Sequence, residues 1–205
     1  MKYLLLLSAI LLMASSVAAQ EVPKMEVFGG YSYLREDLGG AHPGLNGFDA
    51  SFTYNINHFL GVKADISGHF NGKTTINIPT VDFGGLILNR SADIRSSNLL
   101  FLFGPQLTYR KMGRLVPFGH VLLGGVRRKV SFPAEVQTIG NTTITTIIKG
   151  ADTGFGIAFG GGLDIKVAKG VGFRLAQADY VLGNIAGDRQ NIMRISTGLV
   201  LQFGK

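Results

Sequence analysis

The sequence predicts an all-β fold, namely a closed antiparallel up-and-down transmembrane β-barrel of eight strands. Three observations predict it. Large apolar residues alternate with small or polar ones at a period of two, in repeated segments of about 10–14 residues. The connections between these segments alternate between short and long. After the first twenty residues, no apolar run approaches the roughly 20 residues that a membrane-spanning helix needs.

Residues 1–19 are predicted to be a secretory signal peptide. Lys2 gives a positive start, residues 4–13 are apolar apart from Ser8, and small residues precede a cleavage position after Ala19. The apolar run is too short for a membrane anchor. The remaining domain, residues 20–205, has a length that suits a single barrel.

The composition excludes several classes of protein. The chain has no cysteine, which excludes a disulfide-stapled secreted scaffold and a zinc–thiolate site. Charged residues make up 16% of the chain, against about 25% in a typical soluble domain. The 29 glycines suit strands that line a crowded interior.

The clearest alternation lies in residues 153–167. One face carries large apolar side chains, and the other carries glycine, alanine, Asp164 and Lys166. A soluble sandwich or a lipocalin-type barrel would need a broadly polar second face, whereas small residues fit the lumen of a narrow transmembrane barrel. The predicted strands are Lys24–Leu34, Leu45–Ile56, Leu60–Phe70, Arg95–Tyr109, Leu115–Arg127, Thr153–Val167, Val171–Leu182 and Ile192–Phe203.

One predicted strand, Val171–Leu182, alternates poorly. Arg174 falls on the opposite parity from Gln177 and Asp179. A β-bulge between them would return all three polar side chains to one face.

Short and long connections follow one another in strict order. An even number of strands then places both ends of the barrel domain on the short-turn side. The third long connection is predicted to form a β-hairpin with its turn near Gly140-Asn141. The short connections are residues 57–59, 110–114 and 168–170, and the long ones are residues 35–44, 71–94, 128–152 and 183–191.

Both ends of the predicted barrel carry short motifs. The first strand contains Gly30-Tyr31-Ser32-Tyr33, and the last places Ser196, Gly198, Leu201 and Phe203 at the spacing polar–x–Gly–x–x–apolar–x–aromatic. With the signal peptide and the strand pattern, these motifs resemble the small outer-membrane β-barrel family, which includes the membrane domain of outer-membrane protein A and the opacity and attachment proteins. The resemblance implies a bacterial outer-membrane location. It also implies that the terminal motif is an assembly signal for the barrel-insertion machinery. The chain departs from the family in ending on Gly204-Lys205 and in lacking tryptophan.

A set of polar side chains is predicted to face the lumen, with both charge signs in similar numbers. Because an eight-stranded barrel is only wide enough for its side chains to fill, we expect a salt-bridged plug and a structural or surface-interaction role. A narrow ion-conducting path through the same groups is the alternative. The predicted lumen set is Glu26, Asp49, Lys63, Asp65, His69, Asn98, Gln106, His120, Asp164, Lys166, Arg174, Asp179, Arg194 and Gln202.

The sequence predicts no catalytic, cofactor-binding or metal site. His69 shares a face with Ser67, yet no acid is placed to orient the histidine. An outer-membrane lipid-modifying enzyme is therefore the less favoured alternative. The four histidines are not spaced to converge on a metal, and the glycines of residues 154–160 do not match a dinucleotide fingerprint.

The basic charge suggests anionic partners. Without residues 1–19 the formal charge is +6, and the phosphates of lipopolysaccharide and outer-membrane lipids are the natural anions at this surface. Nucleic acid is excluded outside the cell, and a monomer is expected. The cations of the predicted outer loops are Arg35, Lys73, Arg90, Arg95, Arg127, Arg128, Lys129, Lys149 and Arg189, of which Arg90, Arg95, Arg127, Arg128 and Lys129 form the predicted anion-contacting group.

Overall fold

The structure, a computed structural model, describes residues 22–36, 44–70, 74–81, 87–139, 142–185 and 187–204. The predicted signal peptide lies outside these ranges. In the part described, no helix is long and apolar enough to cross a bilayer. The strands are β1 (Met25–Glu36), β2 (Gly44–Asn55), β3 (Leu60–Phe70), β4 (Thr74–Val81), β5 (Ile87–Thr108), β6 (Leu115–Ile139), β7 (Thr142–Ala168), β8 (Val171–Ile185) and β9 (Asp188–Phe203).

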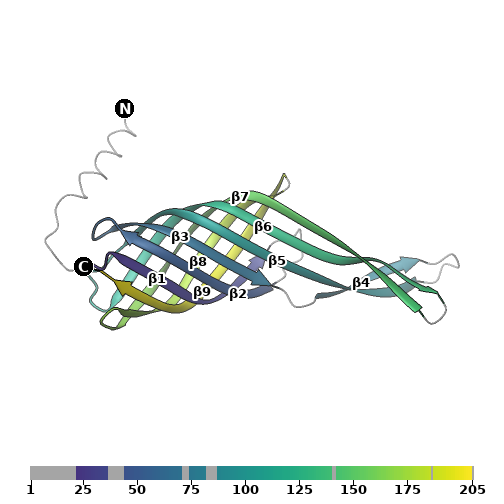
Figure 1. Cartoon of the computed structure of the whole chain (residues 1–205), viewed down its shortest axis with the longest axis horizontal. Helices are drawn as coiled ribbons and strands as arrows, with labels where there is room; N and C mark the ends of the chain where they lie inside the picture. Colours follow the sequence, from purple (N-terminus) through teal and green to yellow (C-terminus); the bar gives the residue numbers. More distant parts are fainter. Residues whose placement is uncertain are drawn as a thin grey trace, which may run out of the picture.

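Eight of these strands form a closed antiparallel barrel (Figure 1). Neighbours follow the order β3-β2-β1-β9-β8-β7-β6-β5, and β5 pairs back onto β3 from Leu60↔Leu107 to Phe70↔Ser97. The first strand, β1, pairs along its whole length with the last strand, β9, from Met25↔Phe203 to Glu36↔Ile192. The prediction of a closed eight-stranded barrel is confirmed.

The seam between β1 and β9 depends on a pair of glycines. Gly30 lies opposite Gly198 in the register. A Cβ built on Gly30 would overlap the carbonyl oxygen of Thr197, and one on Gly198 would approach the carbonyl oxygen of Gly29. Glycine at both positions therefore allows the two backbones to come close enough to close the barrel.

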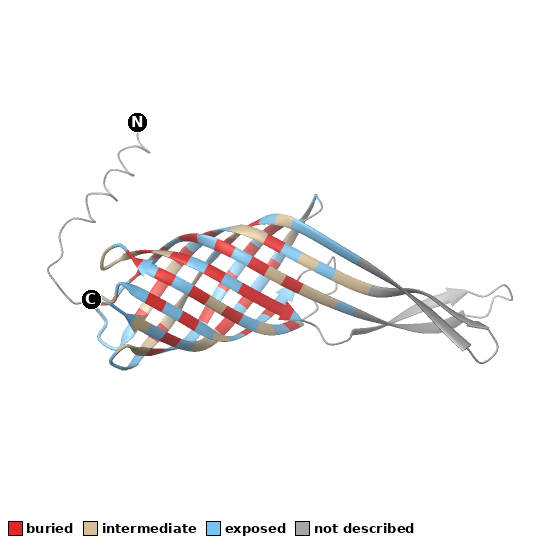
Figure 2. Cartoon of the chain, in the orientation of Figure 1, coloured by how far each residue is buried: buried red, intermediate tan, exposed pale blue. Residues whose placement is uncertain are grey.

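Burial alternates along most of each barrel strand, which gives the chequered pattern of Figure 2. The buried positions face the lumen and are mostly polar, whereas the exposed positions form an apolar outer belt. This inverts the arrangement of a soluble barrel and suits a barrel in lipid. The aromatic members of the belt include Tyr31, Phe48, Phe52, Tyr54, Phe101, Phe103, Phe155, Phe159 and Tyr180.

The irregular strand β8 contains the predicted bulge. The pairing of β8 with β9 shifts register between Arg174 and Gln177. Arg174, Gln177 and Asp179 are all buried as a result. One inserted residue thus returns the three polar side chains to the lumen.

Two hairpins project beyond the barrel (Figure 1). The β6–β7 hairpin runs from Phe132↔Ile148 to Ile139↔Thr142, which confirms the predicted hairpin. The β4–β5 hairpin pairs Thr74–Val81 with residues 87–94. The expectation of a loop over residues 71–94 was wrong. Pro79 lowers the strand propensity of residues 74–81. The segment can still form a strand because it lies at a sheet edge, where the missing N–H of proline is tolerated.

Candidate functional site

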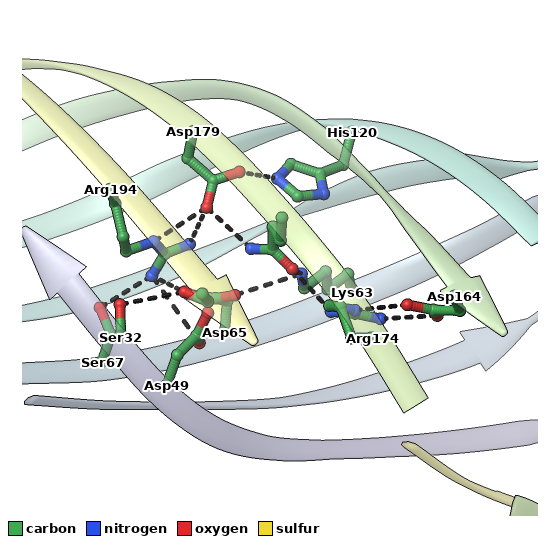
Figure 3. Close-up of polar contacts among 12 residues, drawn as sticks. Ser32, Asp49, Lys63, Asp65, Ser67, His120, Asp164, Arg174, Asp179 and Arg194 are labelled. Atoms are coloured by element: carbon green, nitrogen blue, oxygen red, sulfur yellow. Dashed lines mark hydrogen bonds and ion pairs between the residues drawn. The ribbon is translucent and has the colours of Figure 1, made fainter. Parts of the chain in front are cut away.

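The lumen is organised around Arg194 of β9, which is fully buried. Its Nε donates to Asp179 Oδ2 at 2.9 Å, and its Nη1 donates to Asp65 Oδ1 and to Ser67 Oγ, each at 2.7 Å (Figure 3). Asp49 Oδ1 lies 3.8 Å from the same nitrogen. One guanidinium on β9 thereby joins three carboxylates from β2, β3 and β8.

A histidine bridge crosses the lumen face of β7. His120 Nε2 donates to Asp179 Oδ1 over 2.7 Å (Figure 3). His120 and Asp179 are both register partners of Gly160, on β6 and β8 respectively. A Cβ on Gly160 would overlap Asp179 Oδ1. The glycine therefore leaves the space through which the bridge passes.

A second guanidinium, that of Arg174, lies closer to the short-turn end. Its Nε and Nη2 donate to the two carboxylate oxygens of Asp164 at 2.8 and 3.0 Å, and its Nη1 donates to Gln177 Oε1 at 2.6 Å. The guanidinium lies between the rings of Phe28 and Phe118, 4.2 Å from each centroid. Such a bidentate, ring-stacked arginine is held in one orientation.

Lys63 and Gln177 connect the two arginine centres. Lys63 Nζ donates to Gln177 Oε1 at 3.2 Å and lies 3.3 Å from Asp65 Oδ2. Gln177 Nε2 donates in turn to Asp179 Oδ2 at 2.7 Å. The two arginine centres therefore belong to one continuous network, which we call the lumen network: Asp49, Lys63, Asp65, His120, Asp164, Arg174, Gln177, Asp179 and Arg194.

Glu26 belongs to a separate cluster at the short-turn end. Arg110 donates from Nη2 to Glu26 Oε1 at 2.7 Å and from Nη1 to the carbonyl of His58 at 2.8 Å. Asn55 Nδ2 also donates to Glu26, at 3.2 Å. The sequence predicted that Arg110 lies in a turn, and it did not predict that the side chain of Arg110 binds Glu26 in the barrel.

The hydrogen-bond partner of His69 lies on another strand and is not Ser67, which shares the lumen face of β3 with His69. His69 Nε2 lies 2.8 Å from Ser32 Oγ, which also accepts a hydrogen bond from Ser196. Ser67 instead accepts from Arg194. No described side chain is hydrogen-bonded to His69 Nδ1, and the ring is fully buried. This arrangement offers neither an orienting acid nor access for a lipid substrate.

An apolar layer fills the lumen between this network and the projecting hairpins. Its side chains share the lumen face with the polar groups, and most are fully buried. The sequence did not reveal this layer, because Leu99–Phe103 is apolar on both faces of its strand. The layer comprises Leu34, Leu45, Leu100, Leu102, Leu122, Val126, Ala158, Val181 and Ile192.

Besides Glu26 and His69, four predicted lumen residues lie apart from the lumen network. Lys166 is exposed near the end of β7 and is not part of it, contrary to expectation. Gln202 is half-buried, and Gln106 is buried beside Thr108. Asn98 donates to Glu36 near the projecting end. Lys166 has the lumen parity, but its position at the open mouth lets its long side chain reach water.

The predicted cations lie at the end of the barrel that carries the hairpins. Arg95, Arg127 and Lys129 are exposed on the outward face of β5 and β6, and Arg128 is half-buried. Lys73 and the side chains of Arg90 and Lys149 lie outside the described part of the structure. The residues of the terminal motif are all in β9, where Leu201 and Phe203 face outward and Ser196 is buried.

The family described as "Outer membrane protein beta-barrel domain" matches residues 4–203. The chain belongs to this family. Membership agrees with the resemblance seen in the sequence and places the protein in the bacterial outer membrane. No curated protein matches the chain significantly.

The solved structures that are similar to this barrel are small outer-membrane barrels. Neisserial surface protein A matches with a TM-score of 0.59 and 13% identity, covering 88% of this chain and 97% of that one. Ail, the attachment invasion locus protein of Yersinia pestis, matches at 0.53 and 16%, covering 86% and 97%, in a complex with the heparin analogue sucrose octasulfate. OprG of Pseudomonas aeruginosa matches at 0.53 and 12%, covering 93% and 100%. At these identities the likeness shows the fold.

Proposed function

We propose that this protein is a non-conducting outer-membrane barrel that acts as a surface-attachment protein through its two projecting hairpins. The observation that carries the proposal is the continuation of β5, β6 and β7 past the barrel. In β7 the pairing with β8 begins at Phe155, so residues 142–154 continue beyond it. At about 3.4 Å per residue these residues reach roughly 40 Å, well clear of a lipid headgroup layer.

Two obstacles in series support a closed lumen. The lumen network fills the half near the short turns, and the apolar layer fills the half near the hairpins. A permeant ion would have to displace fixed ion pairs and then lose its hydration among leucine and valine side chains, which is costly. The same two obstacles weigh against the channel alternative.

The exposed cations at the base of the hairpins favour anionic polysaccharides and lipopolysaccharide as the surfaces contacted. Arg95, Arg127 and Lys129 are exposed there. Ail, which has the same fold, forms a complex with a sulfated heparin analogue. Guanidinium and ammonium groups bind sulfate and phosphate oxygens through charge-assisted hydrogen bonds.

The attachment proposal is tested by retention of cells on immobilised heparin, with uncharged dextran as the matched surface. Cells that express the full chain are compared with cells expressing a variant with Arg127→Gln and Lys129→Gln, which removes two of the exposed cations at the base of the hairpins. We expect retention by the full chain on heparin alone and loss in the substituted variant. Equal retention of cells with and without the full chain would refute the proposal.

The closed lumen is tested separately with purified protein in planar bilayers. We expect no steady single-channel conductance. Steady conductance would establish the channel alternative instead. Mass spectrometry of lipid A from cells with and without the gene addresses the enzyme alternative, for which we expect identical spectra.

We also propose that Ser196, Gly198, Leu201 and Phe203 serve as the assembly signal for the barrel-insertion machinery. The support is the outward position of Leu201 and Phe203 on the last strand. Phe203→Ser is expected to lower barrel assembly in cells and to leave refolding into detergent unchanged. Equal assembly of both proteins in cells would refute this role.

A further inference from the structure

The outward face of the barrel has a notch on β6, just below the projecting hairpins. Gly125 faces outward, and its register partners are Phe101 on β5 and Phe155 on β7. Both rings are about half exposed, at 51% and 57%. A Cβ on Gly125 would meet no atom within 4 Å. Two aromatic rings therefore stand on either side of a floor that has no side chain.

The notch continues as an apolar track towards the middle of the barrel. Two residues further along β6, Leu123 is exposed, and its register partners are Phe103 and Ile157. These side chains extend the outward apolar surface below the notch. A track of this kind, walled by rings and floored by glycine, suits a linear hydrocarbon chain.

In the opposite direction along β6, towards the hairpins, the next outward-facing residues are cations. Arg127 and Lys129 follow Gly125 at two-residue steps and share its outward face, which places them about 7 and 14 Å from it along the strand. The register partners of Arg127 are Leu99 and Thr153, both uncharged. Arg95 faces outward on β5, diagonal to Lys129 across the pair Arg95↔Ser131. The three cations thus lie above one apolar notch.

A second outward glycine shows that an empty position alone does not make such a site. Gly29 on β1 also has no atom within 4 Å of a built Cβ. Its register partners are Ala50 and Leu199, and the next outward residues along β1 are Tyr31 and Tyr33. Gly29 therefore has neither paired aromatic walls nor a cation nearby, and it provides a matched control.

We propose that Gly125, Phe101 and Phe155 seat one acyl chain of an acylated phosphosugar, the lipid A class of glycolipid, while Arg127, Lys129 and Arg95 bind its phosphate. The order of the contacts fits a lipid whose phosphate lies at the membrane surface and whose acyl chain points inward. The inference rests on the proposed orientation, with the hairpins outside the cell, and it does not depend on attachment through the hairpins.

The test is native mass spectrometry of the purified full chain in detergent, with bisphosphorylated lipid A as the probe. Gly125→Leu fills the notch, and Arg127→Gln with Lys129→Gln removes two cations. We expect each variant to bind about tenfold more weakly than the native chain, and Gly29→Leu to bind like the native chain. Heat-modifiable gel mobility verifies that every variant is folded, and Phe155→Ala opens the notch should Gly125→Leu fail to fold.

Two results would overturn the proposal. One is unchanged lipid A binding by the folded notch variants. The other is equal binding of phosphatidylglycerol and lipid A, each equally sensitive to the cation substitutions, which would indicate a general anionic-lipid surface. Gly125→Leu separates this site from attachment, because it keeps the exposed cations and both hairpins and should therefore keep retention on heparin while it weakens lipid A binding.

Discussion

His120 and Asp179 are hydrogen-bonded across Gly160, the residue that lies between them in the β6–β7–β8 register. Asp179 also accepts hydrogen bonds from Arg194 and Gln177. A single glycine therefore makes room for a carboxylate that joins three strands. Gly160 therefore serves packing of the lumen network rather than flexibility.

Gly160→Val should disrupt this arrangement, because its Cβ would occupy the position of Asp179 Oδ1. Displacing Asp179 leaves His120 Nε2 without its hydrogen-bond partner and removes one of the carboxylates around the buried Arg194, which we expect to cost about 3–5 kcal/mol of unfolding free energy. The measurement is urea unfolding of the refolded protein. Gly119→Val is the control: the nearest atom to a Cβ at that position is 3.7 Å away, so its cost should stay within about 1 kcal/mol. Equal midpoints for both variants would contradict the role of Gly160.

Arg194→Met removes the cation that joins Asp65, Asp179 and Asp49. The three buried carboxylates would lose the cation that they share, so a loss of about 3–5 kcal/mol is expected. Arg189→Met is the matched substitution at an exposed arginine of the same strand, with an expected effect within about 0.5 kcal/mol. Guanidinium unfolding in detergent micelles measures both, and a small effect at Arg194 would show that the network is not held by it.

Phe159→Arg tests the outward apolar belt. Phe159 is 48% exposed and lies within the part of β7 that pairs with β8 in the barrel, where an arginine facing lipid should cost about 2–4 kcal/mol. Val167→Arg, near the short-turn end and 67% exposed, should cost about 0–1 kcal/mol. The readout is the folded fraction in lipid vesicles, followed by heat-modifiable gel mobility. Identical folded fractions would show that residue 159 does not face the bilayer interior.

The sequence predicted most of the barrel because lipid on one side and a narrow lumen on the other impose a period of two. Even the irregular strand was predictable, since Arg174 and Asp179 are costly to expose to lipid and a bulge was the way to bury both. Two features escaped this logic. In Leu99–Phe103 both faces are apolar, so parity could not reveal the apolar layer of the lumen. The strand β4 pairs outside the membrane, where neither constraint applies.

Contacts between distant strands were beyond sequence reasoning for a different reason. The bidentate pair of Arg174 with Asp164 and the return of Arg110 to Glu26 depend on strand register and side-chain reach. The odd or even position of a residue in its strand indicates which face the residue occupies. It does not determine which residue of the neighbouring strand lies beside it. Lys166 illustrates the limit, because its parity is that of the lumen and its position at the mouth leaves it exposed.

We infer that the barrel crosses the outer membrane with its hairpins on the cell surface. The chain has no cysteine, so single cysteines can be placed at Ala151, an exposed residue near the hairpins, and at Lys169, in the turn between β7 and β8. Intact cells are then treated with a membrane-impermeant maleimide. We predict that Ala151→Cys is labelled on intact cells and that Lys169→Cys is labelled only after lysis. Labelling of Lys169→Cys on intact cells, or of neither variant before lysis, would contradict the claim.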